Sequence, residues 1–206
     1  MMTQKQMLVL ATRNAGKTKE MQELLNDFPV EINNLDDFGP IPSVEEDGVT
    51  FDDNAYKKAS FAAKVLGIPA LADDSGLQVD TLGGAPGVHS ARYAGPNATD
   101  AENNAKLWQE MDGQTNRAAT FVCVISIAVP SGPALTYESE CKGLIADAPG
   151  GDKGFGYDPL FYYPPLKKTF AQMTAEEKNR VSHRGKAFSE LKEEFDKVLT
   201  WIQRKL

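Results

Sequence analysis

The sequence has no long apolar run, no excess of basic residues and little cysteine. No segment approaches the roughly 18 consecutive apolar residues that a membrane-spanning helix needs. Its 22 Lys and Arg are outnumbered by 29 Asp and Glu, which gives a net charge of −7. An acidic chain lacks the basic footprint with which proteins bind a nucleic-acid backbone. We therefore expect neither a membrane nor a nucleic acid as a partner.

Two further features of the sequence bear on the cellular compartment. Met1–Gln6 has no signal-peptide pattern. The two cysteines, Cys123 and Cys141, lie symmetrically about Gly132, so a hairpin there would let them face each other. Two thiols in such a composition are more typical of reduced core residues. We therefore expect a cytoplasmic protein.

Apolar periodicity alternates between strands and helices. We expect strands over residues 6–12, 30–35, 69–73, 119–129 and 134–145, and helices over 17–28, 51–66, 99–113 and 186–204. Thr174 and Glu177 are expected to cap a further short helix. No repeat or linker interrupts the chain, so residues 1–206 are expected to form a single domain with two lobes. The alternating order followed by a hairpin favours an α/β fold with a mixed sheet.

Two adjacent carboxylates, Asp73 and Asp74, close a short apolar run before a glycine-rich, nearly uncharged segment. Neighbouring residues of a strand point to opposite faces, so the two would face different surroundings. Mg²⁺ is usually held by one or two carboxylates and by substrate oxygens. The pair therefore predicts a cation site, although Asp-Asp-Ser-Gly is also typical of a turn.

The first expected strand leads into a helix through a turn with the features of an anion site. Free N–H groups and the dipole at a helix N-terminus attract phosphate, and a lysine there adds positive charge. With Ala11 in place of the first glycine, the segment also resembles a Walker A loop. A plain strand–helix connection is the alternative. The candidate phosphate-binding residues are Thr12, Arg13, Asn14, Ala15, Gly16 and Lys17.

An acidic loop, Ser43–Gly48, precedes the second expected helix. Three adjacent acids are usually a solvated charge run. Beside Asp73 and Asp74, however, a carboxylate from this loop would complete a metal site.

Two later segments have features of a base-binding site. In Gly154–Pro159, glycines permit close backbone approach and aromatic rings offer faces for stacking, unless the rings belong to the core. The second segment is a basic cluster whose cations would hold phosphates or base oxygens, unless it is a solvated helix junction. It contains Lys178, Arg180, His183, Arg184 and Lys186, and for Arg180 and Lys186 the solvated interpretation is favoured.

Six segments together resemble the inosine triphosphate pyrophosphatase family, specifically its bacterial HAM1-like branch. They occur in the family's order and spacing over nearly the whole chain. The segments are A-T-R-N-A-G-K-T-K-E (11–20), E-E-D-G-V-T-F-D-D-N-A (45–55), A-D-D-S-G-L (72–77), G-A-P-G-V-H-S-A-R-Y-A-G (84–95), G-F-G-Y-D-P (154–159) and E-E-K-N-R-V-S-H-R-G-K-A (176–187). Gln78, His89 and Gln172 depart from the residues that the family usually has.

The resemblance implies an elongated mixed sheet with two α/β lobes around a central nucleotide-binding cleft, in a homodimer. It also implies Mg²⁺-dependent hydrolysis of ITP, dITP and XTP to the nucleoside monophosphate and pyrophosphate. A P-loop NTPase or kinase and a non-catalytic nucleotide-binding module are the alternatives.

Residue roles follow from the resemblance in the same way. Glu45 and Asp74 would hold the metal, and Asp74 would be the general base, with Ser75 beside it. The turn at Thr12–Lys17 would line the triphosphate. The base pocket would be formed by Phe155, Gly156, Tyr157, Asp158, Lys178, His183 and Arg184.

Overall fold

The computed structural model describes residues 5–206, which form five α-helices and seven β-strands. The helices are α1 (Ala15–Leu24), α2 (Phe51–Leu66), α3 (Asp100–Glu110), α4 (Ala175–Val181) and α5 (His183–Lys205). The strands are β1 (Gln6–Leu10), β2 (Val30–Asn34), β3 (Ala70–Val79), β4 (Ala118–Ala128), β5 (Ala134–Ile145), β6 (Phe161–Tyr163) and β7 (Lys168–Thr169).

All seven strands belong to one sheet, in the order β2-β1-β3-β4-β5-β6-β7. Strand β1 pairs in parallel with β2 and β3, whereas β6 pairs antiparallel with β5 and β7. The predicted α/β fold with a mixed sheet is confirmed. No helix within residues 5–206 is long and apolar enough to cross a membrane. The signal-peptide expectation rests mostly on residues 1–4, which lie outside the described residues.

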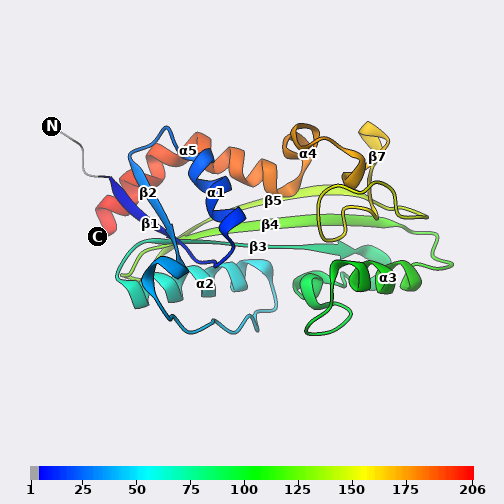
Figure 1. Ribbon diagram of the computed structural model, residues 1–206, viewed down its shortest axis with the longest axis horizontal. Helices are drawn as coiled ribbons and strands as arrows, with labels where there is room; N and C mark the ends of the chain where they lie inside the picture. Colours follow the sequence, from blue (N-terminus) through cyan, green and yellow to red (C-terminus); the bar gives the residue numbers. More distant parts are fainter. Residues whose placement is uncertain (1–4) are drawn as a thin grey trace. The chain divides into compact units, whose positions relative to one another are not determined.

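The chain divides into two compact units. The first comprises the residues up to Asp74 together with 124–138 and 187–206. In this unit α2 covers one face of the strands, while α1 and α5 lie on the other face (Figure 1). The core under α2 consists largely of alanines, among them Ala59, Ala63 and Ala70, which are fully buried. Such small side chains allow a helix to pack close to the sheet.

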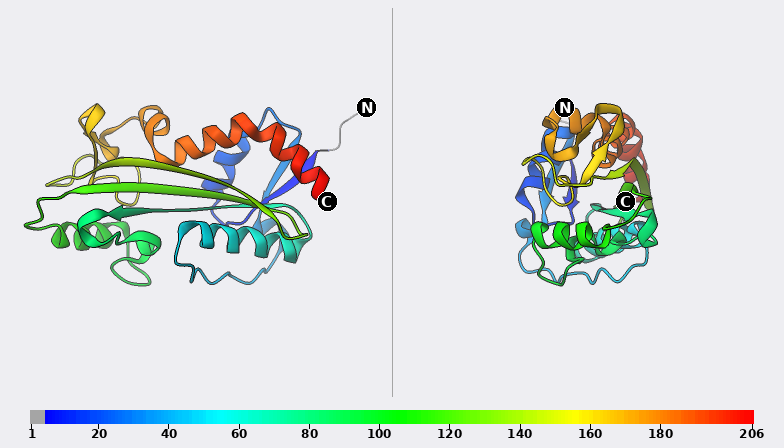
Figure 2. Two further views of the ribbon diagram at one scale, coloured as in Figure 1. Left: turned by 180° about the vertical axis from the view of Figure 1, so that it is seen from behind. Right: turned by 90° about the vertical axis from the view of Figure 1, so that its right-hand side faces the viewer.

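The second unit comprises residues 75–123 and 139–186. Here α3 and α4 lie on opposite sides of the strands (Figure 2). Its core is aromatic: the rings of Phe121 and Phe170 each lie with their centroids 4.6 Å from that of Phe161. Aromatic pairs at this separation add to the stability that burial provides.

Local sequence signals predict α2 correctly at both ends. Thr50 and Asp53 form a capping box at its start, and Gly67 takes a left-handed conformation at its end. Three other helices differ from expectation, since α1 already ends at Leu24, α3 ends at Glu110 and α5 begins at His183.

The alternative interpretation of Asp73–Gly76 as a turn is wrong, because these residues belong to a strand. Strand β3 continues through Ser75 and Gly76 to Val79. The continuation is explained by burial, because Leu77 and Val79 are fully buried in the core of the second unit.

The hairpin of β4 and β5 does not place the two cysteines opposite each other. Val129 N donates to Pro133 O at one end, and Ile145 N donates to Arg117 O at the other. This register places Cys123 opposite Ser139 and not opposite Cys141. Both thiols are buried, and neither is in a disulfide.

Candidate functional site

Paired strands position the first part of the site. Leu10 of β1 lies beside Leu71 of β3, and Ala11 N donates to Leu71 O at 2.7 Å. The turn at Thr12–Lys17 therefore leaves the sheet next to Asp73. Carboxyl ends of parallel strands are where open α/β sheets bind their ligands.

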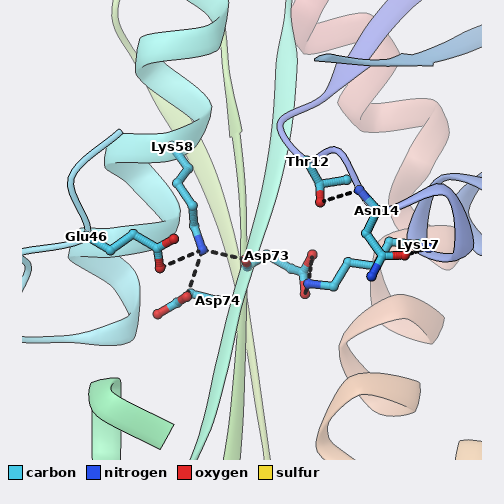
Figure 3. A network of polar contacts seen from close by, with 7 residues as sticks. All are labelled: Thr12, Asn14, Lys17, Glu46, Lys58, Asp73 and Asp74. Carbon is cyan, nitrogen blue, oxygen red and sulfur yellow. Dashed lines mark hydrogen bonds and ion pairs between the residues drawn. The ribbon is translucent and has the colours of Figure 1, made fainter. Parts of the chain in front are cut away.

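Asp73 and Asp74 point to opposite faces of β3, as the strand period predicts (Figure 3). The Asp73 carboxylate accepts hydrogen bonds from Lys17 Nζ of α1 at 2.9 and 3.1 Å. The Asp74 carboxylate instead accepts from Lys58 Nζ of α2 at 2.7 Å. Each aspartate therefore has its own lysine from a different helix.

Lys58 is the centre of a set of oxygen atoms. Besides Asp74, its Nζ donates to Asp73 O at 3.0 Å and to Glu46 Oε2 at 3.4 Å. Burial acts to lower the pKa of Lys58, but the charges of Asp74, Glu46 and Asp73 outweigh it, so this pKa lies above its usual value. Burial raises the pKa of Asp74, against the opposing effect of Lys58.

Helix α2 also holds the acidic loop. Asn54, one helical turn before Lys58, is fully buried, and its Oδ1 accepts a hydrogen bond from Gly48 N at 2.8 Å. Glu46 is the loop carboxylate that this arrangement brings to Lys58. Glu45, the residue expected from the sequence, is exposed and lines neither of the cavities described below.

The turn at Thr12–Lys17 is closed by local hydrogen bonds. Asn14 is the N-cap of α1, where its Oδ1 accepts from Lys17 N at 3.1 Å, and Thr12 Oγ1 accepts from Asn14 N at 3.2 Å. Arg13 is turned toward other partners. Its guanidinium pairs with Asp36 and donates to Ile41 O at 2.9 Å.

A cavity of about 330 Å³ lies at this place in the first unit. Cations and carboxylates together line it, which suits a phosphate chain and a metal ion. The polar lining residues are Thr12, Arg13, Lys17, Ser43, Glu46, Lys58 and Asp73.

The donor set fits a hard cation. Three oxygen atoms, from Glu46, Asp73 and Asp74, already surround the Lys58 ammonium. Within residues 5–206, no three His, Cys, Asp or Glu side chains are grouped so that they would hold a metal by themselves. Sites of this kind use one or two carboxylates and leave the other positions to water and substrate phosphates.

The second unit contains another cavity, of about 170 Å³, beside the loop at Gly154–Asp158. The Phe155 ring is 70% exposed, and Lys178 Nζ lies 4.5 Å from its centroid. Lys178 also forms an ion pair with Asp158, whose Oδ2 accepts from Phe155 N at 3.0 Å. Burial raises the pKa of Asp158, against the opposing charge of Lys178. An exposed ring next to polar groups suits a planar, hydrogen-bonding ligand.

Other predicted residues of the base pocket are placed differently. Tyr157 is 4% exposed, and its hydroxyl donates to Ser90 O at 2.8 Å, so only its ring reaches the cavity. His183 lines the cavity and stacks on Phe121 with centroids 4.6 Å apart. Ser75 also lines it, whereas Arg184 is not among the lining residues.

Sequence reasoning missed Lys58, Asn54 and the part played by Glu46. The sequence does contain a signal for Asn54 and Lys58: they are four residues apart in a helix with capping signals at both ends, so they share one face. Their binding partners are distant in the sequence, so the spacing alone does not indicate what either side chain binds.

Comparisons with known proteins identify the family of this chain. A model of the Ham1 family matches residues 8–194. A relative from Syntrophobacter fumaroxidans, named dITP/XTP pyrophosphatase, is 64% identical over 195 residues, which cover 95% of this chain and 84% of the relative. One from Desulfotalea psychrophila with the same name is 59% identical over 200 residues, which cover 97% of this chain and 90% of the relative.

Solved structures extend the similarity to the fold. The Ham1 protein of Staphylococcus aureus has a TM-score of 0.88 and 41% identity, over 93% of this chain and 98% of that one. A HAM1 protein from Coxiella burnetii also has a TM-score of 0.88, with 45% identity, over 95% of this chain and 98% of that one. Because the family model spans most of the chain and the relatives match it nearly end to end, this chain belongs to the Ham1 family.

Proposed function

We propose that this chain hydrolyses deaminated purine nucleoside triphosphates, namely ITP, dITP and XTP, to the nucleoside monophosphate and pyrophosphate. Relatives that share more than half of its residues have the name dITP/XTP pyrophosphatase. The observation that carries the proposal is the pair of aspartates on β3, each bound to a lysine from a different helix. A protein that only bound nucleotides would have no need of two such acid–base pairs.

In this proposal the first unit binds the triphosphate. Lys17 and the backbone N–H groups of Asn14–Gly16 stabilise the charge that develops on the leaving pyrophosphate. Asp74 orients a water and accepts its proton as the water oxygen attacks the α-phosphorus. The bond from that phosphorus to the bridging oxygen breaks, and the electron pair leaves with pyrophosphate.

The cofactor of this reaction is proposed to be Mg²⁺, held by Asp74 and one carboxylate of the acidic loop. The family resemblance implies Glu45, whereas in the structure it is Glu46 that shares the Lys58 ammonium with Asp74. The ion supplies charge neutralisation on the phosphate oxygens when it is bound. Lys58 keeps the Asp74 carboxylate in place beside it.

The second unit binds the base. Phe155 offers its ring for stacking, and Lys178 is the donor for the keto oxygen at C6 of hypoxanthine or xanthine. Adenine presents an amino group there, so a donor would remain unpaired. Each such mismatch costs about 1–3 kcal/mol in a buried site. His183 and Arg184 stay proposed members of this pocket.

The test separates the products. We expect the protein with Mg²⁺ to convert ITP into IMP and pyrophosphate, and to convert ATP far more slowly. Pyrophosphate and orthophosphate are quantified separately. Orthophosphate with a nucleoside diphosphate would instead indicate a P-loop type of reaction, and binding of ITP without any product would indicate a binding module.

The assembly and location remain part of the proposal. We expect one catalytic domain over residues 1–206, acting as a cytoplasmic homodimer on small nucleotides, with no nucleic acid or membrane as partner. Light scattering coupled to size-exclusion chromatography measures the oligomeric state directly. A mass of one chain would contradict the dimer.

The contact between Gly48 and Asn54 gives a prediction about the acidic loop. A Cβ at Gly48 would lie 2.5 Å from Asn54 Oδ1 and 2.7 Å from Asp53 Cβ. Because Asn54 is fully buried, Gly48→Ala displaces the loop and lowers kcat/KM for ITP by about tenfold or more. Val49→Ala is the control, because Val49 is the next residue of the same loop and is 86% exposed. If both variants lost the same activity, the Gly48 contact would have no special role.

A further inference from the structure

The loop that presents Phe155 is held from outside by helix α3. Gly156 N donates to Asp100 Oδ2 at 2.6 Å, and Asn104 Nδ2 donates to Gly156 O at 2.7 Å. Both backbone polar groups of one residue are therefore bound by two side chains a single helical turn apart. Residues at this spacing share one face of a helix. We call Asp100 and Asn104 the α3 clamp.

The loop needs such support. Gly156 has a φ of +58°, in the left-handed region, and Phe155 beside it is largely exposed. The Phe155 backbone is otherwise bound within the loop: its N donates to the Asp158 carboxylate, which Lys178 shares, and its O accepts from Asp158 N at 3.3 Å. The α3 clamp therefore fixes the residue directly after Phe155, whose ring is proposed to stack on the base.

The Asn104 side chain also has an energetic cost that a residue with only a packing role would avoid. Its Nδ2 donates to both Gly156 O and Asp100 O, each at 2.7 Å. Its Oδ1, by contrast, is buried and accepts no hydrogen bond from any part of the chain within residues 5–206. An unsatisfied buried acceptor destabilises the fold. Leucine at this half-buried helix position would avoid the cost, but it would also lose both hydrogen bonds that the Asn104 amide nitrogen donates.

We propose that Asp100 and Asn104 are positioning residues that set base selectivity by fixing Gly156, and through it Phe155 and Asp158. This inference rests on the proposed hydrolysis of deaminated purine nucleotides. Asn104 acts through the backbone of Gly156. When the clamp is released, the ring and the carboxylate lose their fixed separation, and discrimination between a keto and an amino group weakens.

The main test is Asn104→Leu, with Gln109→Leu as the matched control. Gln109 is an exposed residue of the same helix whose side chain makes none of the contacts described above. We expect Asn104→Leu to raise KM for ITP about tenfold, to leave kcat within about threefold, and to lower the ITP/ATP ratio of kcat/KM at least fivefold. Gln109→Leu leaves all three unchanged. Equal losses on ITP and ATP, or unchanged values for Asn104→Leu, would overturn the proposal.

A second measurement is independent of catalysis. Amide hydrogen exchange of the peptide containing Gly154–Asp158 should accelerate in Asn104→Leu and Asp100→Ala, and much less in Asp100→Asn, which retains an acceptor oxygen. Unchanged exchange would overturn the clamp even if activity fell. If the wild-type protein failed to hydrolyse ITP, the proposed function would be wrong, while the exchange result would still decide whether the clamp orders the loop.

Discussion

Replacing Asp74 with asparagine is expected to lower kcat/KM for ITP by about 10³-fold or more, because both a general base and a metal-binding carboxylate are lost. Asparagine has nearly the same shape and still accepts a hydrogen bond from Lys58. The change therefore removes the negative charge and the proton acceptor and leaves the volume intact. Pyrophosphate release at saturating Mg²⁺ measures the loss. Turnover near the wild-type rate would show that Asp74 is not the base.

The interpretation of that result depends on what happens to Lys58. Its side chain is 15% exposed and that of Asp74 is 13% exposed, so the two charges are largely removed from water. Losing one partner of such a pair destabilises a protein because the other charge stays buried. The melting temperature must therefore be measured with the rate. Asp196→Asn, on an exposed position of α5, is the control for the same chemical change without a role in the site.

A third variant separates stability from chemistry. In Lys58→Met/Asp74→Asn both buried charges are gone, so part of the lost stability should return while the activity stays low. Recovery of activity together with stability would show that Asp74→Asn had acted through unfolding.

The parts of the fold that the sequence predicted are those that short-range chemistry controls. Helix α2 was predicted at both ends because its capping box and its terminal glycine are local signals. Capping boxes also begin α3 and α4 where the Thr–x–x–Glu spacing places them. Strand β3 was predicted too short, because Ser75 and Gly76 favour a turn locally and only the burial of Leu77 keeps them extended.

The residues of the site also divide into those that local patterns predict and those that depend on how the helices pack. Strand alternation was enough to predict that Asp73 and Asp74 face opposite ways. Which lysine meets each of them depends on how α1 and α2 pack on the sheet, and no short spacing encodes that. Arg13 illustrates the limit: it belongs to the phosphate-binding motif, yet its guanidinium pairs with Asp36, a residue beyond the next strand.

The second large effect is expected at Lys178. Lys178→Met should lower kcat/KM for ITP by about 10–100-fold and lower the ratio of kcat/KM for ITP to that for ATP. The reason is that the donor to the keto oxygen and the cation over the Phe155 ring are both lost. The same change leaves Asp158, with a side chain 3% exposed, without its cation. Breaking a buried pair in this way costs about 3–5 kcal/mol. A fall in rate alone would therefore not identify base recognition.

Two further variants separate base recognition from damage to the fold. Lys178→Met/Asp158→Asn removes both charges, so it should regain stability but keep the narrowed ITP/ATP ratio. Lys168→Met is the matched control, since Lys168 pairs with Glu177 at 2.8 Å in a more exposed ion pair. Pairs of that kind contribute about 0–1 kcal/mol, so this variant should change neither stability nor selectivity by much. If the ITP/ATP ratio of kcat/KM stays at the wild-type value in both Lys178 variants, Lys178 does not recognise the base. Its role would then be to neutralise Asp158.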